Sequence, residues 1–302
     1  MPASTSPTIQ CELCGQGVVY AANRNEFNYF QCLNCKFLFI FPEPSSSHIY
    51  ELYVQQEEIE TSVQRKLGKL VSKIKSLPIS EDANILDIGS QNGDFLEKLP
   101  MNFNWKLFGV EPSLSARDIS LQSPRFSIKK GFFDPGDYEK KQFELVNLGD
   151  VIEHLEKPEH LVSGVKQICS DDGFFIVTTP IIDCPYVYIS NLYHKLFRNF
   201  CPQAYLTPPH HIKYFTSSNL DNLLYKNGFS KIDCWFGPSN FSYEIAESEI
   251  FLGFRDKSSI EKFNPIFLSR VLVFCSMYLS ARLISLFSRK DFSYTAIYQN
   301  KN

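Results

Sequence analysis

The sequence predicts an α/β protein built on a doubly wound, mostly parallel sheet, with a small metal-binding ribbon in front of it. Short apolar runs of strand length alternate with helical patterns from about residue 84 to residue 235, and two pairs of cysteines lie within the first 35 residues. Such alternation is typical of parallel sheets covered by helices. With 302 residues, 44% of them hydrophobic, the chain is long enough for one large core and a smaller unit.

Composition narrows the classes of function. A formal net charge of −3 and the lack of a long basic run argue against a protein whose main task is binding nucleic-acid phosphates. The first residues, MPASTSPTIQ, have neither a cationic nor an apolar region, so we expect no secretory signal. Five cysteines outside the paired ones are scattered, which favours a reducing compartment and a cytoplasmic location: Cys169, Cys184, Cys201, Cys234 and Cys275.

The paired cysteines predict a zinc ribbon over residues 1–46. The segments CELCG and CLNCK each contain a C-x-x-C pair, and 17 residues separate the pairs. This spacing is typical of a tetrahedral zinc site with four thiolates. The metal would supply folding energy that so short a segment lacks, and a closed four-cysteine shell indicates a structural role. The expected ligands are Cys11, Cys14, Cys32 and Cys35.

Residues 47–302 form the second predicted domain. Apolar residues recur at helical spacing from Ile49 to Leu77 and stop at Pro78, which predicts one or two amphipathic helices. The segment ANILDIGSQNGDFLEKL then reads as a strand, a glycine turn and a helix. Three further strands are expected in WKLFGVEP, FELVNLGD and GFFIVTTP, with a helix in VIEHLEKPEHLVSGVKQIC after the second of these. A helix in SSNLDNLLYKNGF ends at Asn227-Gly228, and SKIDCWFG is a further strand.

A nucleoside-containing cofactor is expected at the carboxyl ends of these strands, where doubly wound sheets bind ligands. The glycines of DIGSQNG would let the backbone approach the cofactor. Glu111 lies 22 positions after Gly89, at the end of the next strand, where an acidic residue can bind both ribose hydroxyls. The spacing D-x-G-x-x-x-G differs from G-x-G-x-x-G, so a nicotinamide or flavin dinucleotide is disfavoured.

The segments LDIGSQNGDF, GVEPS, FELVNLGDVIEHLEKP, GFFIVTTP and HHIKYFT resemble the ordered motifs of class I S-adenosylmethionine-dependent methyltransferases. With its leading ribbon, the chain is similar to the branch of sugar C-methyltransferases and methyltransferases of surface-glycan pathways. The resemblance implies a Rossmann-like sheet closed by an antiparallel last strand, DFSYTAIYQN. It also implies a cofactor site formed by Asp87, Gly89, Gln91, Gly93, Glu111, Phe132, Phe133, Leu148 and Gly149.

Within this site the resemblance assigns Asp87, Gly89 and Gly93 to the methionine end of the cofactor. Glu111 would hold the ribose, the two phenylalanines would lie near the adenine, and Leu148 and Gly149 would flank the sulfonium. Gln91 stands where the family often has glycine. It is the single feature that favours a non-enzymatic ribbon module with a decayed cofactor site.

Three histidines are the candidates for acceptor chemistry. By resemblance to the H-I-x-x-F-T segment of the family, His211 is the expected general base and His210 packs against or orients the acceptor; alternatively both only tie the lid to the sheet. His154 faces the cofactor or packs in the core, and Asp150 with Glu153 has the spacing of a capping box. A second metal site is not expected, because adjacent side chains of an extended segment diverge and no other cluster of His or Cys is near in sequence.

Two insertions are expected, a lid over about 181–215 and a helical one over about 238–290. Within 266–290 only 11 uncharged residues separate Arg270 from Arg282, too few for a spanning helix. This segment packs on the sheet or in a homodimer, or else lies on a membrane surface as an interfacial helix. The expected reaction is methyl transfer to a small acceptor, a sugar or glycan, with a quinone or other lipid-like molecule as the alternative.

Overall fold

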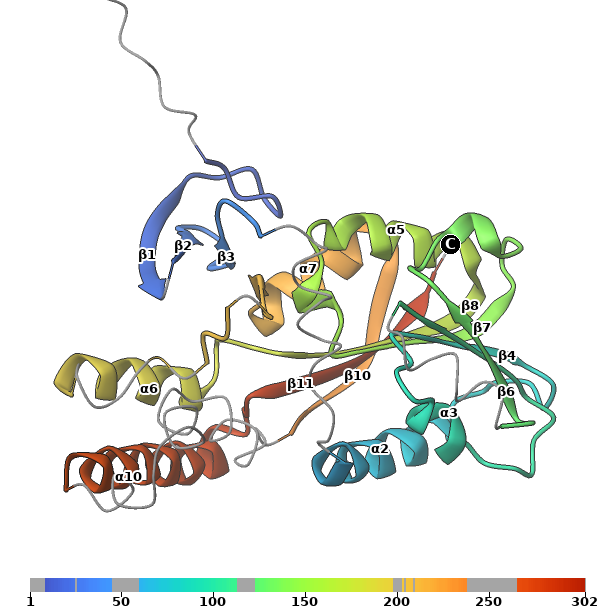
Figure 1. The fold of residues 1–302 in the computed structure, drawn as a ribbon. Helices are drawn as coiled ribbons and strands as arrows, with labels where there is room; N and C mark the ends of the chain where they lie inside the picture. Colours follow the sequence, from blue (N-terminus) through green and yellow to red (C-terminus); the bar gives the residue numbers. More distant parts are fainter. Residues whose placement is uncertain are drawn as a thin grey trace, which may run out of the picture.

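A computed structural model describes residues 9–24, 26–44, 60–112, 123–197, 203, 205–208, 210–237 and 265–301. Its centre is a seven-stranded sheet of strand order β10-β11-β8-β7-β4-β5-β6 (Figure 1). The strands are β4 (Asn84–Ile88), β5 (Lys106–Glu111), β6 (Phe126–Lys130), β7 (Phe143–Gly149), β8 (Cys169–Pro180), β10 (Phe229–Gly237) and β11 (Ser293–Asn300). Only β11 runs against its neighbours.

This architecture confirms the predicted α/β fold with an antiparallel last strand. All the strands expected after residue 83 are present, and β11 coincides with the expected segment DFSYTAIYQN. Strand β6 was not predicted, because the alternation in FSIKK is short and mostly polar; only Phe126 and Ile128 of this strand are buried.

Helices cover both faces of the sheet (Figure 1). On one face α2 (Glu60–Ile74) and α3 (Asp94–Lys98) bury Ile74, Phe95 and Leu96 in one hydrophobic cluster. On the other face α5 (Pro158–Ile168) and α7 (Ser217–Lys226) belong to a second cluster. The expected helix over 49–77 is present from residue 60 and ends before Pro78, and residues 49–59 lie outside the described part of the chain.

One expected helix begins later than predicted. After β7 the chain forms a short 3-10 turn, η2 (Ile152–His154), and α5 starts at Pro158, whose fixed φ suits the first helical position. The capping box expected for Asp150 and Glu153 is absent. The turn has Val151 at its N-cap without a side-chain bond, and Glu153 Oε2 instead accepts a hydrogen bond from Thr179 Oγ1 at 2.9 Å.

The ribbon has its own sheet, which reaches into the rest of the molecule. Strands β1 (Val18–Arg24), β2 (Phe27–Cys32) and β3 (Leu38–Ile40) pair antiparallel, and β3 also pairs with β9 (Lys213–Tyr214). Strand β9 directly follows the two histidines of the lid segment. The four-stranded sheet therefore joins the ribbon to the segment that carries the acceptor-side candidates.

Helices α6 (Pro185–Leu196) and α10 (Pro265–Ser288) lie side by side at one end of the molecule (Figure 1), with Ser276 Oγ 3.3 Å from Tyr193 OH. One side of α10 is buried, including Phe274, Met277 and Ala281, whereas other apolar side chains are exposed: Leu272, Leu279, Leu283, Ile284, Leu286 and Phe287. No helix in the described ranges combines the length and apolarity needed to cross a membrane.

Candidate active site

The turn between β4 and α3 is shaped by two glycines in left-handed conformation. Gly89 has φ 76° and Gly93 has φ 80°. A Cβ on Gly89 would lie 2.4 Å from Val151 Cγ2, and one on Gly93 would lie 2.5 Å from the Phe126 ring. Neither position can carry a larger residue without a shift of its neighbours. The turn is therefore held close to the sheet and to the segment after β7.

Gln91 also fits this turn. Its φ of 43° lies in the left-handed region, which costs a non-glycine residue about 1 kcal/mol. Its backbone N–H donates to Glu111 Oε2 at 2.9 Å, and Glu111 is 6% exposed. The departure from the glycine of the family thus leaves the turn intact, so Gln91 gives no support to a decayed cofactor site. Glu111 ties the tip of the turn to the end of β5.

Asp87 and Asn147 form a buried polar pair at the carboxyl ends of β4 and β7. Asn147 Nδ2 donates to Asp87 Oδ1 at 2.7 Å. Burial raises the pKa of Asp87 to about 7, the hydrogen bond from Asn147 opposes this, and the charge of Glu111 adds to it. Among the described residues, buried Asn147 Oδ1 and Ser90 Oγ have no hydrogen-bond partner. These atoms would suit the ammonium or other polar groups of a bound cofactor.

The remaining predicted cofactor residues lie along the same edge of the sheet. Phe132 and Phe133 follow β6; the first is 60% exposed, and the second stacks on Tyr138 with ring centroids 6.0 Å apart. Leu148 is fully buried and Gly149 ends β7. The structure therefore brings the nine predicted residues to the ends of four neighbouring strands, β4 to β7.

Next to this edge, η2 and the lid segment bring His154 and His211 together. Their ring centroids are 4.8 Å apart at an interplanar angle of 60°. His154 Nδ1 lies 2.5 Å from the carbonyl oxygen of His210, and His154 Nε2 lies 4.0 Å from Glu153 Oε1. The backbone N–H of Ile212 donates to the carbonyl oxygen of Glu153 at 3.0 Å, which fixes the lid segment against η2.

These contacts and the burial of the two rings determine their protonation state. A carbonyl oxygen only accepts, so Nδ1 of His154 carries the proton and Nε2 keeps its lone pair. Burial lowers the pKa of His154 to about 4 and holds the pKa of His211 well below 6.5. Both rings are therefore neutral at neutral pH. Glu153 was predicted to be part of a helix cap and was therefore not recognised as a member of this cluster. The adjacent Glu153 and His154 after the end of a strand were the sequence signal that could have indicated it.

The ribbon holds the chain on both sides of the two lid histidines. Beyond them, the Nζ of fully buried Lys213 lies 2.6 Å from Glu12 Oε1 and 2.6 Å from Glu43 Oε1. Before them, Arg24 donates to the carbonyl oxygen of Gln203 at 2.6 Å and also to that of Leu206. The position of His211 thus depends on residues near the start of the chain.

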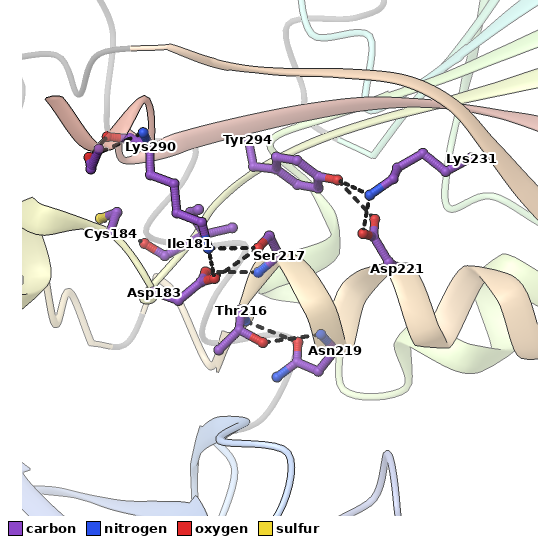
Figure 2. A network of polar contacts seen from close by, with 11 residues as sticks. Ile181, Asp183, Cys184, Thr216, Ser217, Asn219, Asp221, Lys231, Lys290 and Tyr294 are labelled. Atoms are coloured by element: carbon purple, nitrogen blue, oxygen red, sulfur yellow. Dashed lines mark hydrogen bonds and ion pairs between the residues drawn. The ribbon is translucent and has the colours of Figure 1, made fainter. Parts of the chain in front are cut away.

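The start of α7 strengthens this connection. Thr216 and Asn219 form a reciprocal capping box, and Asn219 Nδ2 also donates to the carbonyl oxygen of Cys35 at 3.1 Å. Figure 2 shows the neighbouring network, in which Asp183 accepts from the backbone N–H of Ser217 at 2.8 Å and from Lys290 Nζ at 2.7 Å. This network ties α7 to the chain after β8 and to the segment that precedes β11.

The four ribbon cysteines form a cluster that could hold a metal ion. Their sulfur atoms are 3.6 Å apart for Cys11 and Cys35, 3.5 Å for Cys14 and Cys32, and 3.7 Å for Cys14 and Cys35. Four sulfurs at zinc-bond length around one tetrahedral ion would be about 3.8 Å apart. Burial raises the pKa of Cys35 to about 11, so a bound cation would be needed to keep it as a thiolate at neutral pH.

Comparisons with known proteins agree with this geometry. Residues 57–233, more than half of the chain, match the model of a family described as a methyltransferase domain. A carboxy-S-adenosyl-L-methionine synthase from Staphylococcus epidermidis is 23% identical over 207 residues, which cover 63% of this chain and 90% of that protein.

Two solved structures share the fold. One is a protein from Galdieria sulphuraria described as a sarcosine dimethylglycine methyltransferase, with a TM-score of 0.52, 14% identity and coverage of 83% of this chain and 91% of that one. The other is the [4+2]-cyclase SpnF, with a TM-score of 0.53, 13% identity and coverage of 86% and 98%. At these identities the likeness shows the fold alone.

Proposed function

Since this chain belongs to the methyltransferase-domain family and is an S-adenosylmethionine-dependent methyltransferase, we propose that its acceptor is a sugar or glycan, methylated at a hydroxyl or a carbon. One observation carries the proposal: the glycine turn packs against the start of the segment that bears Glu153 and His154. Val151, at the start of the turn that bears Glu153 and His154, fills the space beside Gly89. Two neutral imidazoles thus lie near the cofactor edge, as deprotonation of a hydroxylated acceptor requires.

The cofactor would be held by the residues at the ends of β4 to β7. Glu111 would bind the ribose, Phe132 and Phe133 would pack near the adenine, and Asp87 with Asn147 would receive polar groups of the methionine end. When bound, the cofactor supplies an electrophilic methyl group on a sulfonium. The chain aligns the acceptor with this methyl group and removes a proton.

For a hydroxyl acceptor, His211 takes the proton from the oxygen. The oxygen would then bond to the methyl carbon that the cofactor supplies, with S-adenosylhomocysteine as the leaving group. His154 positions His211 through the edge-on ring contact, and His210 positions His154 through its carbonyl oxygen. A neutral imidazole is needed for this step, and the lowered pKa of His211 keeps it neutral at neutral pH.

Zinc bound to the four cysteines would have a structural role. A closed thiolate shell leaves no position for a substrate, but it would fix the backbone of Cys35, to which α7 is bonded. The ribbon then acts as a support for the lid segment through β3, β9 and the buried Lys213.

A quinone or other lipid-like acceptor is the second candidate. The exposed apolar side chains of α6 and α10 favour it, since they could meet a membrane surface or a second copy of the chain: Leu192, Leu196, Leu279, Leu283 and Phe287. Two cations that an interfacial helix would turn toward lipid headgroups are already in ion pairs within the chain, Arg282 with Asp291 and Lys290 with Asp183. We therefore rank this candidate below a sugar or glycan.

The test is methyl transfer from isotopically labelled S-adenosylmethionine into two separate fractions of cell extract, one of water-soluble sugars and glycans and one of lipids. We expect label in the first fraction and identification of the product by mass spectrometry. Label found only in the lipid fraction would contradict a sugar or glycan acceptor and would support a quinone or other lipid-like acceptor. Calorimetry that detects no binding of S-adenosylmethionine or S-adenosylhomocysteine would contradict the proposed cofactor site.

A further inference from the structure

Glu153, His154 and His211 have the arrangement of metal ligands. Each offers one ligand atom, and these atoms all lie within 4.8 Å of one another. We propose that these three residues form a second metal site, which binds a divalent first-row transition-metal ion in addition to the cysteine cluster. No such site was predicted from the sequence, because adjacent side chains of an extended segment diverge and no other cluster of His or Cys is near His211 in sequence. The fold of the lid segment brings His211 and His154 together, although 57 positions separate them.

Hydrogen bonds already fix two of the three ligands. Nδ1 of His154 is bonded to the carbonyl oxygen of His210, which leaves Nε2 with a lone pair at 4.0 Å from Glu153 Oε1. Glu153 Oε2 accepts from the fully buried Thr179 at 2.9 Å. Metal-bound histidines usually donate their second nitrogen to a carbonyl or carboxylate, and ligating carboxylates are hydrogen-bonded in turn. Both supporting contacts are present here.

The spacing needs only a small adjustment. Two ligands of one ion are at most about 4.4 Å apart when metal–ligand bonds are about 2.0–2.2 Å long. The 4.0 Å between Glu153 Oε1 and His154 Nε2 fits this limit, and since no separation exceeds 4.8 Å, a small side-chain rotation would bring all three ligand atoms within it. Two imidazoles and one carboxylate suit ions such as Mn²⁺, Fe²⁺ and Zn²⁺.

The carboxylate ligand is buried. Glu153 is 1% exposed, and a metal ion is one of the partners that a buried carboxylate can have. Three protein ligands leave coordination positions open, unlike the closed shell of the cysteines. The two sites therefore differ in both donor atoms and access.

The role of this second metal ion in the reaction rests on the proposed function. An acceptor hydroxyl bound to the ion would have a lowered pKa and would lose its proton to a water molecule, while its oxygen bonds to the methyl carbon and the carbon–sulfur bond breaks. In the metal-bound protein His211 is then a ligand and does not take the proton. The ion activates the hydroxyl instead, by lowering its pKa.

The test is a titration with Mn²⁺ of protein that contains one zinc ion per chain, the amount that fills the cysteine cluster alone, followed by the electron paramagnetic resonance signal of free Mn²⁺. Oxygen and imidazole ligands can bind this ion, whereas thiolate sites favour softer metals. We expect one Mn²⁺ per chain, and at least tenfold weaker binding in Glu153→Gln and His211→Ala. His160→Ala is the matched control, because this exposed histidine lies outside the cluster and should leave binding unchanged.

Calorimetric binding of S-adenosylhomocysteine shows whether each variant is folded. No Mn²⁺ binding by the wild-type chain, or equal binding by both folded variants, would overturn the site. This measurement needs no acceptor, so it stands whatever the methyl-transfer assay gives. Full-rate transfer by zinc-loaded protein freed of the second ion would leave the proposed function intact and remove the ion from the reaction.

Discussion

His154 donates through Nδ1 to the carbonyl oxygen of His210, and this bond joins the turn after β7 to the lid segment. One backbone carbonyl thereby determines which nitrogen of His154 keeps a lone pair. It also holds the next residue, His211, edge-on to the His154 ring. The proposed acceptor chemistry would therefore depend on the path of the lid backbone as much as on the two rings.

Replacing His211 by alanine should lower methyl transfer by roughly a hundredfold or more, because the acceptor loses the group that activates its hydroxyl. S-adenosylhomocysteine affinity and the unfolding midpoint should stay close to wild type, since His211 lies on the acceptor side and is partly exposed. Steady-state kinetics with the identified acceptor provides the measurement, with His160→Ala as the control. Full activity of His211→Ala would exclude the role.

Replacing Glu111 by alanine should weaken cofactor binding by about 2–3 kcal/mol, because the ribose loses a charged acceptor and the Gln91 N–H loses its partner. Glu111→Gln should retain part of the affinity, since its amide oxygen can still accept from Gln91. Calorimetry with S-adenosylhomocysteine compares the two with Glu139→Ala, an exposed position. Equal affinities in all three variants would place the ribose contact elsewhere.

Asp87 should make stability depend on pH. Its pKa is about 7 in the folded chain against an ordinary 3.8, so the folded state holds a proton that the unfolded state has lost between these values. The stabilisation is therefore complete below about pH 4 and is lost as the pH rises through 7, by up to about 4 kcal/mol.

The variant Asp87→Asn should remove this dependence, because the amide stays neutral and can still accept from Asn147. We expect its free energy of unfolding to exceed that of wild type above neutral pH in the absence of cofactor. Urea unfolding between about pH 5 and pH 8 tests this. Parallel pH profiles of the two proteins would show that Asp87 is already ionised.

Lys213→Met should destabilise the contact between ribbon and lid by about 2 kcal/mol. The value lies below the loss expected for a fully buried ion pair, because Glu12 and Glu43 keep 34% and 27% side-chain exposure. Lys141→Met is a matched control; its ion pair with Asp171 is exposed and should contribute less than about 0.5 kcal/mol. Urea unfolding monitored by protection of the lid segment against hydrogen exchange would detect the difference. Equal losses in the two variants would contradict the supporting role of Lys213.

Cys14→Ser should release the zinc that we expect at one ion per chain, because three thiolates no longer close the shell. Methyl transfer should fall with the metal content, whereas cofactor affinity should persist, since the glycine turn has no contact with the cysteines in the described contacts. Elemental analysis of reduced wild-type protein that finds no zinc would refute the ribbon assignment.

Local patterns predicted the features that depend on neighbouring residues in the sequence. The glycine turn, the acid at the end of β5 and the alternation of strands and helices each lie within one short segment, where spacing and residue type determine the structure. The four cysteines were predictable for the same reason. Strand β6 was missed because its short and largely polar sequence gives a weak signal.

Contacts between distant segments could not be predicted in this way. Glu153 has the spacing of a cap, but its hydrogen bond goes to Thr179 on the neighbouring strand, a partner that only the sheet places there. Lys213 reads as an ordinary surface lysine, and its burial follows from two ribbon carboxylates about 170 and 200 positions earlier in the sequence. The chemistry of the acceptor side depends on such contacts.

The pairing of β3 with β9 and the place of β11 between β8 and β10 bear on how the polypeptide matures. The ribbon strands β1 to β3 are synthesised before β9, so their sheet lacks a strand until residue 214 has left the ribosome. Strand β10 must likewise wait for β11, which ends at Asn300. A fragment limited to residues 57–233 would have unpaired edges on both β9 and β10, which invites association with other chains. The sequence family and the folding unit of this protein therefore have different boundaries.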